Sequence, residues 1–281
     1  MGKISDFYKK IFHKIKLKKN LDKIKVEFRN LDDLFNHFGS DKGSVVSKIH
    51  GRDPRVGKYT GHGYHKFYEK YLNKIKDKNF NMLEIGTYKG ASIASFYFYF
   101  KKANIFGIDK SFKFQFKSSR VKFFHCDTTK EKDLKKFEIF LKNNNCKFFD
   151  LIIDDGSHLL SDIKKNFLFF FEYLNPGGYY VIEDYNHPKY YEYANDIRNN
   201  EQLISDFLVS LKEKKIFSSK ISNFNSDNKL FDRVSNVHVH KGNMVLDREM
   251  LVAQDAAVSE KAIKELSNIN VSDIAFIQKK L

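Results

Sequence analysis

Short apolar runs alternate with longer amphipathic segments from residue 80 onward. Each run is rich in β-branched or aromatic residues and ends at an acidic residue or a glycine, as buried strands do. The runs are NMLEIG at 81–86, NIFGID at 104–109, VKFFHCD at 121–127, FDLIIDDG at 149–156 and GGYYVIED at 177–184. Segments long enough for helices separate them, at 91–101, 130–142 and 159–174. This alternation predicts an α/β fold with five parallel strands in a doubly wound sheet.

The C-terminal part of the pattern predicts two more strands. VSNVHVH at 234–240 and MVLDRE at 244–249 flank a short Gly-containing turn, which is typical of a hairpin. An antiparallel C-terminal hairpin would complete a seven-stranded, Rossmann-like sheet. His238 and His240 share one face of this hairpin, and we interpret them as ordinary strand positions.

Four parts of the chain differ in pattern. We expect a basic amphipathic helix, an accessory or cap region, the main α/β domain and a helical C-terminal tail. Their predicted bounds are 1–25, 26–75, 76–250 and 251–281. Within the main domain, a polar, tyrosine-rich insertion is expected at 185–230, with a helix near 201–214.

The predicted N-terminal helix is strongly basic. Apolar residues recur at helical spacing while lysines fill the other side, and the first twenty residues hold seven Lys against one Asp. Such a helix packs on its own domain or on a second subunit, or docks on an anionic membrane surface or a partner enzyme. The sequence leaves these alternatives open.

Composition narrows the classes of protein further. The chain has 281 residues, 42% of them hydrophobic, so a substantial core is expected. Its two cysteines, Cys126 and Cys146, form no CxxC motif, which argues against a disulfide framework or a zinc site and favours a reducing cytoplasm. No apolar run reaches the length of a membrane span, and the first residues lack the apolar middle of a secretory signal.

A ligand site is predicted after the first strand. LEIGTYKGAS opens a helix, so Gly86 and Gly90 fall where backbone approaches a ligand at a helix N-terminus. Asp109 ends the second strand, where an acid accepts hydrogen bonds from ribose hydroxyls. The close glycines of a pyrophosphate-binding loop are missing, which favours S-adenosylmethionine over a dinucleotide.

Two further features fit this donor. Asp127 and Thr128 end the third strand, where they could contact an adenine amino group. Glu84 lies inside the end of the first strand, where a carboxylate needs a cationic or hydrogen-bonded partner. The ammonium group of the donor's methionine part is one natural partner.

Acidic residues at the ends of two later strands predict a metal site. If the strands at 149–156 and 177–184 are neighbours, Asp155 approaches Glu183 and Asp184. Three carboxylates without a cysteine suit Mg²⁺, with Mn²⁺ or Ca²⁺ as alternatives. His158, at the start of the next helix, would face the same cavity and accept the proton of a hydroxyl acidified by the metal.

With these motifs, residues 34–248 resemble the class I S-adenosylmethionine-dependent methyltransferases, and among them the metal-dependent sugar O-methyltransferases of the mycinamicin and macrocin type. The resemblance rests on GSDKGS, HGYHKFYEKY, LEIGTYKGAS, DDGSH and LNPGGYYVIEDY. It implies Mg²⁺ on Asp155, Glu183 and Asp184, and His158 as the base. It also implies donor contacts from residues 84–90, including Thr87 and Tyr88, and from Asp109, Asp127 and Thr128, with Tyr64 closing over the donor.

The resemblance implies transfer of a methyl group to a sugar hydroxyl. By family analogy and composition, we expect the acceptor to be a nucleotide-linked sugar or a bacterial surface (capsular) polysaccharide precursor, and the protein to be a homo-oligomer. A catechol or phenolic acceptor is the alternative within the enzyme class. A basic nucleic-acid-binding protein is the alternative from another class, given the formal charge of +15, but no nucleic-acid module is recognised and no nucleic-acid partner is expected.

Overall fold

The computed structural model describes residues 18–28, 30–46, 59–191, 194, 201–215, 217, 219, 228–245 and 269–281. Most of the predicted N-terminal helix therefore lies outside the described residues. Its last residues were predicted to be α-helical, but they form a short strand, β1 (Lys19–Asn20), and a single 3-10 turn, η1 (Leu21–Lys23). No helix in the described part of the chain combines the length and apolar character needed to cross a membrane.

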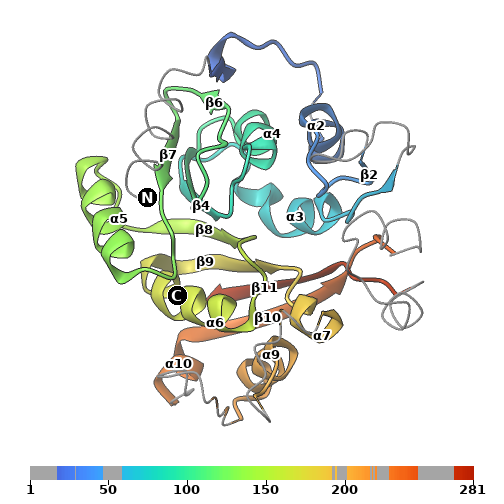
Figure 1. Cartoon of the computed structure of the whole chain (residues 1–281), viewed down its shortest axis with the longest axis vertical. Helices are drawn as coiled ribbons and strands as arrows, with labels where there is room; N and C mark the ends of the chain where they lie inside the picture. Colours follow the sequence, from blue (N-terminus) through green and yellow to red (C-terminus); the bar gives the residue numbers. More distant parts are fainter. Residues whose placement is uncertain are drawn as a thin grey trace, which may run out of the picture.

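A seven-stranded sheet forms the centre of the molecule (Figure 1), in the order β10-β11-β9-β8-β4-β5-β7. The five parallel strands are β4 (Asn81–Ile85), β5 (Asn104–Asp109), β7 (Val121–His125), β8 (Phe149–Asp154) and β9 (Leu174–Glu183). The two antiparallel strands are β10 (Val234–Lys241) and β11 (Asp273–Lys279). The predicted seven-stranded fold class is confirmed.

The position of the last strand corrects the sequence prediction. β10 pairs with β11 at the end of the chain, and β11 inserts between β10 and β9. The predicted helical tail is therefore wrong for residues 273–279, while residues 246–268 lie outside the described part. The physical reason is the run Ile274 to Ile277, which is fully buried. A continuous apolar run suits a strand covered on both faces, whereas the charges of LDRE do not.

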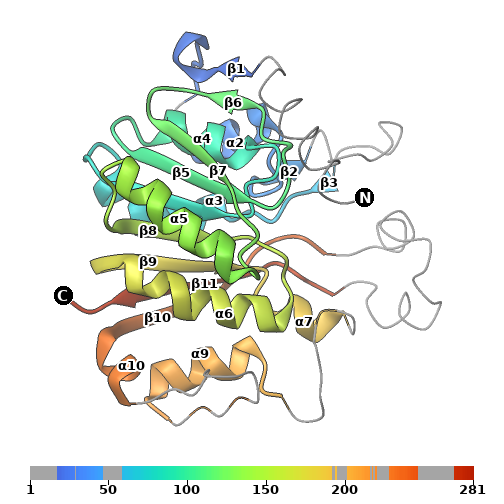
Figure 2. The same cartoon turned by 60° about the vertical axis from the view of Figure 1, so that its left-hand side comes forward.

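Helices cover both faces of the sheet (Figure 2). α2 (Leu31–Phe38), α3 (His65–Leu72) and α4 (Ala91–Tyr99) pack on one face. α5 (Glu131–Asn143), α6 (Leu160–Phe170) and α9 (Ile204–Glu213) pack on the other. Side chains along β4 alternate between the two cores, Met82 on the first side and Leu83 and Ile85 on the second.

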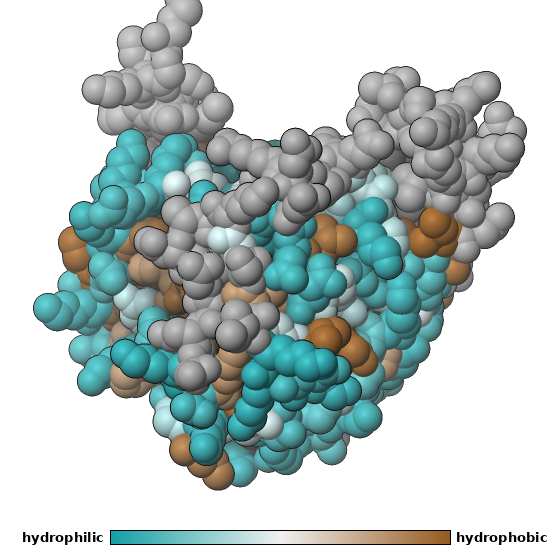
Figure 3. Space-filling model, turned by 90° about the horizontal axis from the view of Figure 1, so that it is seen from below, coloured by the Kyte–Doolittle hydropathy of each residue, from teal (hydrophilic) through white to brown (hydrophobic). Residues whose placement is uncertain are grey.

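The remaining elements are short. They are β2 (Val45–Val46), β3 (Tyr59–Thr60), β6 (Phe116–Lys117), α7 (His187–Tyr190), α10 (Asn228–Arg233), η2 (Asn73–Ile75) and η3 (Phe171–Tyr173). The face seen from below in Figure 3 is mostly hydrophilic over its described residues, and apolar side chains form separate spots on it.

The accessory region is more ordered than a loop, because α2 ends in a tightly anchored turn. Gly39 closes the helix in the left-handed conformation, with φ 77°. The carboxylate of Asp32 then accepts hydrogen bonds from the N–H of Ser44 at 2.6 Å and from its hydroxyl at 2.7 Å. The carbonyl of Gly43 accepts from the N–H of Gly63 at 2.9 Å. These contacts fix the segment between α2 and β2 against α2 and against the segment that precedes α3.

Candidate active site

The candidate site lies where the order of the parallel strands reverses. β4 and β8 are neighbours, with Ile85 beside Asp154, and the following strands extend in opposite directions from this pair. Ligands of open α/β sheets bind beyond the carboxyl ends of the strands at such a point. A pocket of about 460 Å³ opens here, lined by the segments after β4, β5, β7 and β8 and by the turn after α2.

The turn after β4 depends on a glycine. Gly86 has φ 87°, and a Cβ there would lie 1.9 Å from the carbonyl oxygen of Asp155. A side chain therefore has no room, and the close approach predicted for Gly86 is made to the backbone after β8. Gly90, also at φ 87°, is the N-cap of α4 and faces the ring of Phe114. Gly86 lines the pocket, whereas Gly90 is not among its lining residues.

The two strand-end acids predicted to hold the donor line this pocket, together with Thr87, Tyr88 and Thr128. Asp109 accepts hydrogen bonds from the N–H of Tyr88 at 2.7 Å and of Ser111 at 2.6 Å. Asp127 accepts from the hydroxyl of Thr129 at 2.7 Å and pairs with Lys130 at 2.5 Å. Asp127 is thus held within its own turn, and Asp109 is held by its own turn and by the turn after β4.

Glu84 is fully buried in β4. Its Oε2 accepts a hydrogen bond from the hydroxyl of Ser92 at 2.8 Å, while its Oε1 has no hydrogen-bond partner among the described residues. Burial raises the pKa of this carboxyl to about 7, although the ammonium of Lys42 opposes the shift. A buried, unpaired carboxylate oxygen beside a pocket suits a cationic group of a ligand, such as an ammonium.

Asp155, His158 and Asp184 form the candidate metal centre. One ligand atom from each lies within 4.8 Å of the others, and all three residues are half-buried. The Nε2 of His158 is 3.5 Å from Oδ1 of Asp155. Asp184 follows β9 with φ 50°, and His158 precedes α6 with φ 56°. These left-handed turns lie at Asp184 and His158 themselves, and the structure brings both side chains close to Asp155.

Glu183 does not belong to this group, in contrast to the predicted three-carboxylate set. Its Oε2 accepts a hydrogen bond from Nζ of Lys42, and its Oε1 accepts one from the hydroxyl of Tyr68. The same Lys42 ammonium donates to Oδ2 of Asp155 at 2.5 Å. Because adjacent strand residues point to opposite faces, Glu183 turns toward the buried lysine while Asp184 turns toward His158.

Lys42 is the functional candidate that the sequence reasoning missed. Its side chain is almost completely buried, with 2% exposed, and it contributes to the pocket wall. Burial disfavours its charge, yet Asp155 and Glu183 together hold the pKa of Lys42 well above its ordinary value. The lysine was visible in GSDKGS, but no rule of spacing links that segment to residues more than a hundred positions away.

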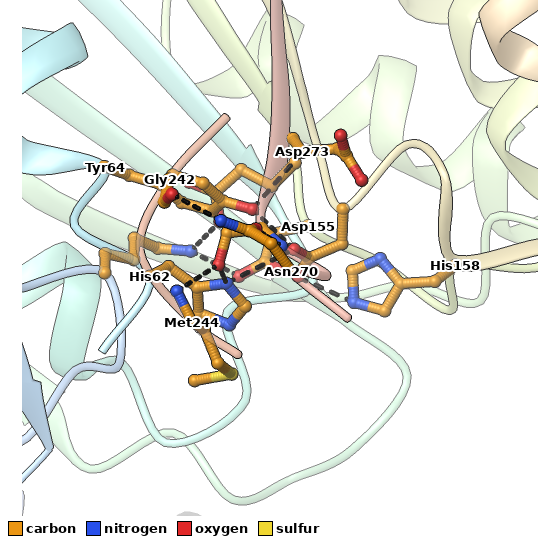
Figure 4. A network of polar contacts seen from close by, with 12 residues as sticks. His62, Tyr64, Asp155, His158, Gly242, Met244, Asn270 and Asp273 are labelled. Carbon is orange, nitrogen blue, oxygen red and sulfur yellow. Dashed lines mark hydrogen bonds and ion pairs between the residues drawn. The ribbon is translucent and has the colours of Figure 1, made fainter. Parts of the chain in front are cut away.

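Tyr64 was predicted to close over the donor, but it is not among the residues that line the pocket. It contacts instead the acidic cluster, which consists of Asp155, Glu183 and Asp184. The side chain is completely buried, and its hydroxyl donates to Oδ1 of Asp184 at 2.5 Å. His62 stacks on its ring at 4.9 Å and places Nδ1 3.5 Å from the same Asp184 oxygen. Figure 4 shows His62, Tyr64, Asp155 and His158 drawn together around this point.

His238 and His240 lie on β10, away from the acidic cluster, as ordinary strand residues. The ring of His240 stacks on Phe67 at 4.4 Å, and its Nε2 is 2.7 Å from the hydroxyl of Tyr71. His238 stacks on the ring of Tyr71 at 4.9 Å. Both rings therefore pack on aromatic side chains of α3.

The central part of the chain is similar to known proteins. Residues 83–185 match the family described as "Methyltransferase domain". L-olivosyl-oleandolide 3-O-methyltransferase of Streptomyces antibioticus is 32% identical over 133 residues, which are 45% of this chain and 32% of the relative. 8-demethyl-8-alpha-L-rhamnosyl tetracenomycin-C 2'-O-methyltransferase of Streptomyces olivaceus is 29% identical over 142 residues, 48% of this chain and 35% of the relative.

The chain thus spans about a third of the length of these curated relatives. A solved methyltransferase from the mycinamycin biosynthetic pathway, in complex with Mg, SAH and mycinamycin VI, superposes with a TM-score of 0.58 at 17% identity. The superposition covers 90% of this chain and 55% of that one, and it shows the shared fold. Residues 83–185 thus match a methyltransferase domain family, and the predicted resemblance to methyltransferases is confirmed.

Proposed function

We propose that this protein is an S-adenosylmethionine-dependent, Mg²⁺-assisted O-methyltransferase that acts on a sugar hydroxyl. One observation carries the proposal: the pocket at the carboxyl end of β4 opens directly beside the Asp155, His158 and Asp184 group, and Asp155 lines that pocket. A donor site and a hydroxyl-activating site therefore share a wall. The sugar O-methyltransferase names of the matched relatives support the same reaction.

The donor half of the proposal assigns roles to Glu84, which is buried next to the pocket but is not among its lining residues, and to five residues that line it. Oε1 of Glu84, which lacks a hydrogen-bond partner among the described residues, would accept from the ammonium of the donor's methionine part. Asp109 would hold the ribose hydroxyls, and Asp127 with Thr128 would flank the adenine. Thr87 and Tyr88 complete the wall after β4. Bound S-adenosylmethionine supplies the methyl group as a reactive sulfonium.

The metal half rests on oxygen ligands. Asp155 and Asp184 offer the carboxylates that Mg²⁺ prefers, with Mn²⁺ as the alternative. Glu183 is linked to Asp155 through the ammonium of Lys42, which donates to both carboxylates. A bound Mg²⁺ supplies Lewis-acid polarisation of the acceptor hydroxyl. Nε2 of His158 would take the hydroxyl proton, since this nitrogen faces Asp155 at the mouth of the site. Holding the acceptor oxygen beside the donor would supply a further part of the acceleration.

The proposed acceptor is a nucleotide-linked sugar or a bacterial surface (capsular) polysaccharide precursor. A formal charge of +15 favours recruitment of an anionic acceptor, and neighbouring sugar hydroxyls suit a metal-assisted site. Transfer of label from methyl-labelled S-adenosylmethionine to a panel of nucleotide sugars and of catechols tests this choice. Labelling of sugars with Mg²⁺ supports the proposal, whereas labelling of catechols alone would replace the acceptor class.

Three related predictions concern assembly and location. The protein is predicted to be a cytoplasmic homo-oligomer, with residues 1–20 contacting a partner or the inner face of the membrane. Most of the charged residues in this segment lie outside the described part of the chain. Co-sedimentation of the full chain and of a chain lacking residues 1–20 with anionic and neutral vesicles measures the membrane contact, and light scattering of both measures the oligomeric state.

A further inference from the structure

Lys42 divides the two oxygens of Asp155 between two tasks. Its ammonium donates to Oδ2 at 2.5 Å, whereas Oδ1 is the oxygen that lies 3.5 Å from Nε2 of His158. One edge of the carboxylate is therefore occupied by a cation that belongs to the protein. The other edge faces the candidate metal centre.

The lysine is held firmly in this position. Glu183 accepts from the same ammonium and is itself fixed from the far side by the hydroxyl of Tyr68. The backbone of Lys42 is anchored as well, because its carbonyl accepts from the N–H groups of Tyr64 at 2.8 Å and His65 at 3.2 Å. Moving this ammonium away would cost much energy, because it would leave the carboxylates of Asp155 and Glu183 without a cationic partner.

This arrangement restricts how Asp155 can bind a metal. With Oδ2 taken, the carboxylate offers one oxygen and acts as a monodentate ligand. Mg²⁺ and Mn²⁺ are satisfied by single oxygens in octahedral geometry, whereas Ca²⁺ takes about 6–8 oxygens and often uses both oxygens of one carboxylate. The neighbouring ammonium therefore disfavours a metal that needs both oxygens of Asp155.

We propose that Lys42 is a positioning residue that sets the metal preference of the site, favouring Mg²⁺ and Mn²⁺ over Ca²⁺ by keeping Asp155 monodentate. The inference rests on the proposed metal-assisted function. It goes further because it gives the GSDKGS segment a role. In this role Lys42 affects the choice of metal and not only the stability of the fold.

The experiment measures metal binding without any turnover. Calorimetric titration, or displacement of Mn²⁺ followed by electron paramagnetic resonance, gives the affinities of the full chain for Mn²⁺, Mg²⁺ and Ca²⁺. In Lys42→Met, which frees Oδ2 of Asp155, the ratio of Ca²⁺ to Mg²⁺ affinity should rise by about tenfold or more. Lys42→Arg, which keeps a cation against Asp155, should stay near the wild-type ratio.

Two further variants separate this effect from loss of a buried charge. Lys42→Met combined with Glu183→Gln removes one positive and one negative charge together, so it tests the ratio even where the single variant does not fold. Lys164→Met is the matched control, because Lys164 is also buried and pairs with an acid, Glu201, that is not part of the acidic cluster. The control should keep the wild-type ratio.

The outcomes distinguish the inference from the proposed function. A raised Ca²⁺ to Mg²⁺ ratio in the Lys42→Met variants, with an unchanged ratio in Lys164→Met, supports the role of Lys42. An unchanged ratio in folded Lys42→Met variants that still bind Mn²⁺ overturns that role alone. A wild-type chain that binds none of the three ions overturns both this role and the metal part of the proposed function.

Discussion

The two halves of the candidate site are built in different ways. In the donor half, the side chains lie at the ends of their own strands or in the turns that follow, and the acids Asp109 and Asp127 are held by residues of the same or the adjoining turn. In the acidic half, Lys42 and Tyr64 reach Asp155 and Asp184 from a segment more than a hundred residues away. Local turn chemistry shapes the first half, whereas long-range charge pairing shapes the second.

The largest effect is expected where the two halves meet. Asp155→Asn keeps the shape of the side chain but removes the charge that pairs with Lys42 and that would bind the proposed divalent ion. Turnover should fall by about 10³-fold or more, because several kcal/mol of charge stabilisation are lost. Donor affinity should persist, since the donor groups lie mainly after β4, β5 and β7. Calorimetry of donor binding beside a labelled-methyl assay measures both, and near-normal turnover would show that the acidic half is not catalytic.

His158→Gln tests the division of labour inside the acidic half. If Nε2 of His158 takes the hydroxyl proton, turnover should drop by about 10²–10³-fold while metal affinity is retained. A parallel loss of Mn²⁺ affinity would instead make His158 a metal ligand, which its place in the three-residue group also permits geometrically.

Asp109→Ala tests the donor half in isolation. The carboxylate holds two backbone N–H groups and lines the pocket, so its loss should weaken donor binding by about 10–100-fold. Turnover at saturating donor should stay close to normal, because the acidic half is intact. Asp127→Ala is the companion variant. Unchanged donor affinity in both would place the donor elsewhere.

The smallest predicted effect is a pH dependence of donor affinity. Burial raises the pKa of Glu84 to about 7, so in the free protein this carboxyl is mostly neutral below that pH and charged above it. A donor ammonium binds the charged form, and affinity should therefore rise as pH increases. Between about pH 6 and about pH 8 the gain should be roughly tenfold. Calorimetry at several pH values measures it, and Glu84→Gln should give weaker binding without this dependence.

Much of the donor half was predictable, and the acidic half was predictable only in part. The five parallel strands, the turn at Gly86 and the acids Asp109 and Asp127 follow from local pattern, because strand ends and turns have short-range signals. The meeting of Asp155 with Asp184 followed from the assumption that β8 and β9 are neighbours, which the structure confirms.

The failures share a physical cause. The pairing of Lys42 with Glu183, the contact of Tyr64 with Asp184 and the insertion of β11 into the sheet all join distant segments. The spacing of hydrophobic residues and the turn signals describe the chain only locally. They do not indicate which charged residues from distant segments pair with each other. Glu183 and Asp184 are adjacent and were both predicted as metal ligands, whereas in the structure Glu183 pairs with Lys42 and only Asp184 joins Asp155 and His158.

The most direct test brings donor and metal together without an acceptor. S-adenosylmethionine carrying a ¹³C-labelled methyl group is bound to the full chain, and the relaxation of the methyl signal is followed as Mn²⁺ is added. Because Asp155 belongs both to the pocket and to the metal group, strong relaxation enhancement is expected, and it should disappear in Asp155→Asn. A methyl signal that stays sharp while donor and Mn²⁺ are both bound would contradict the shared site.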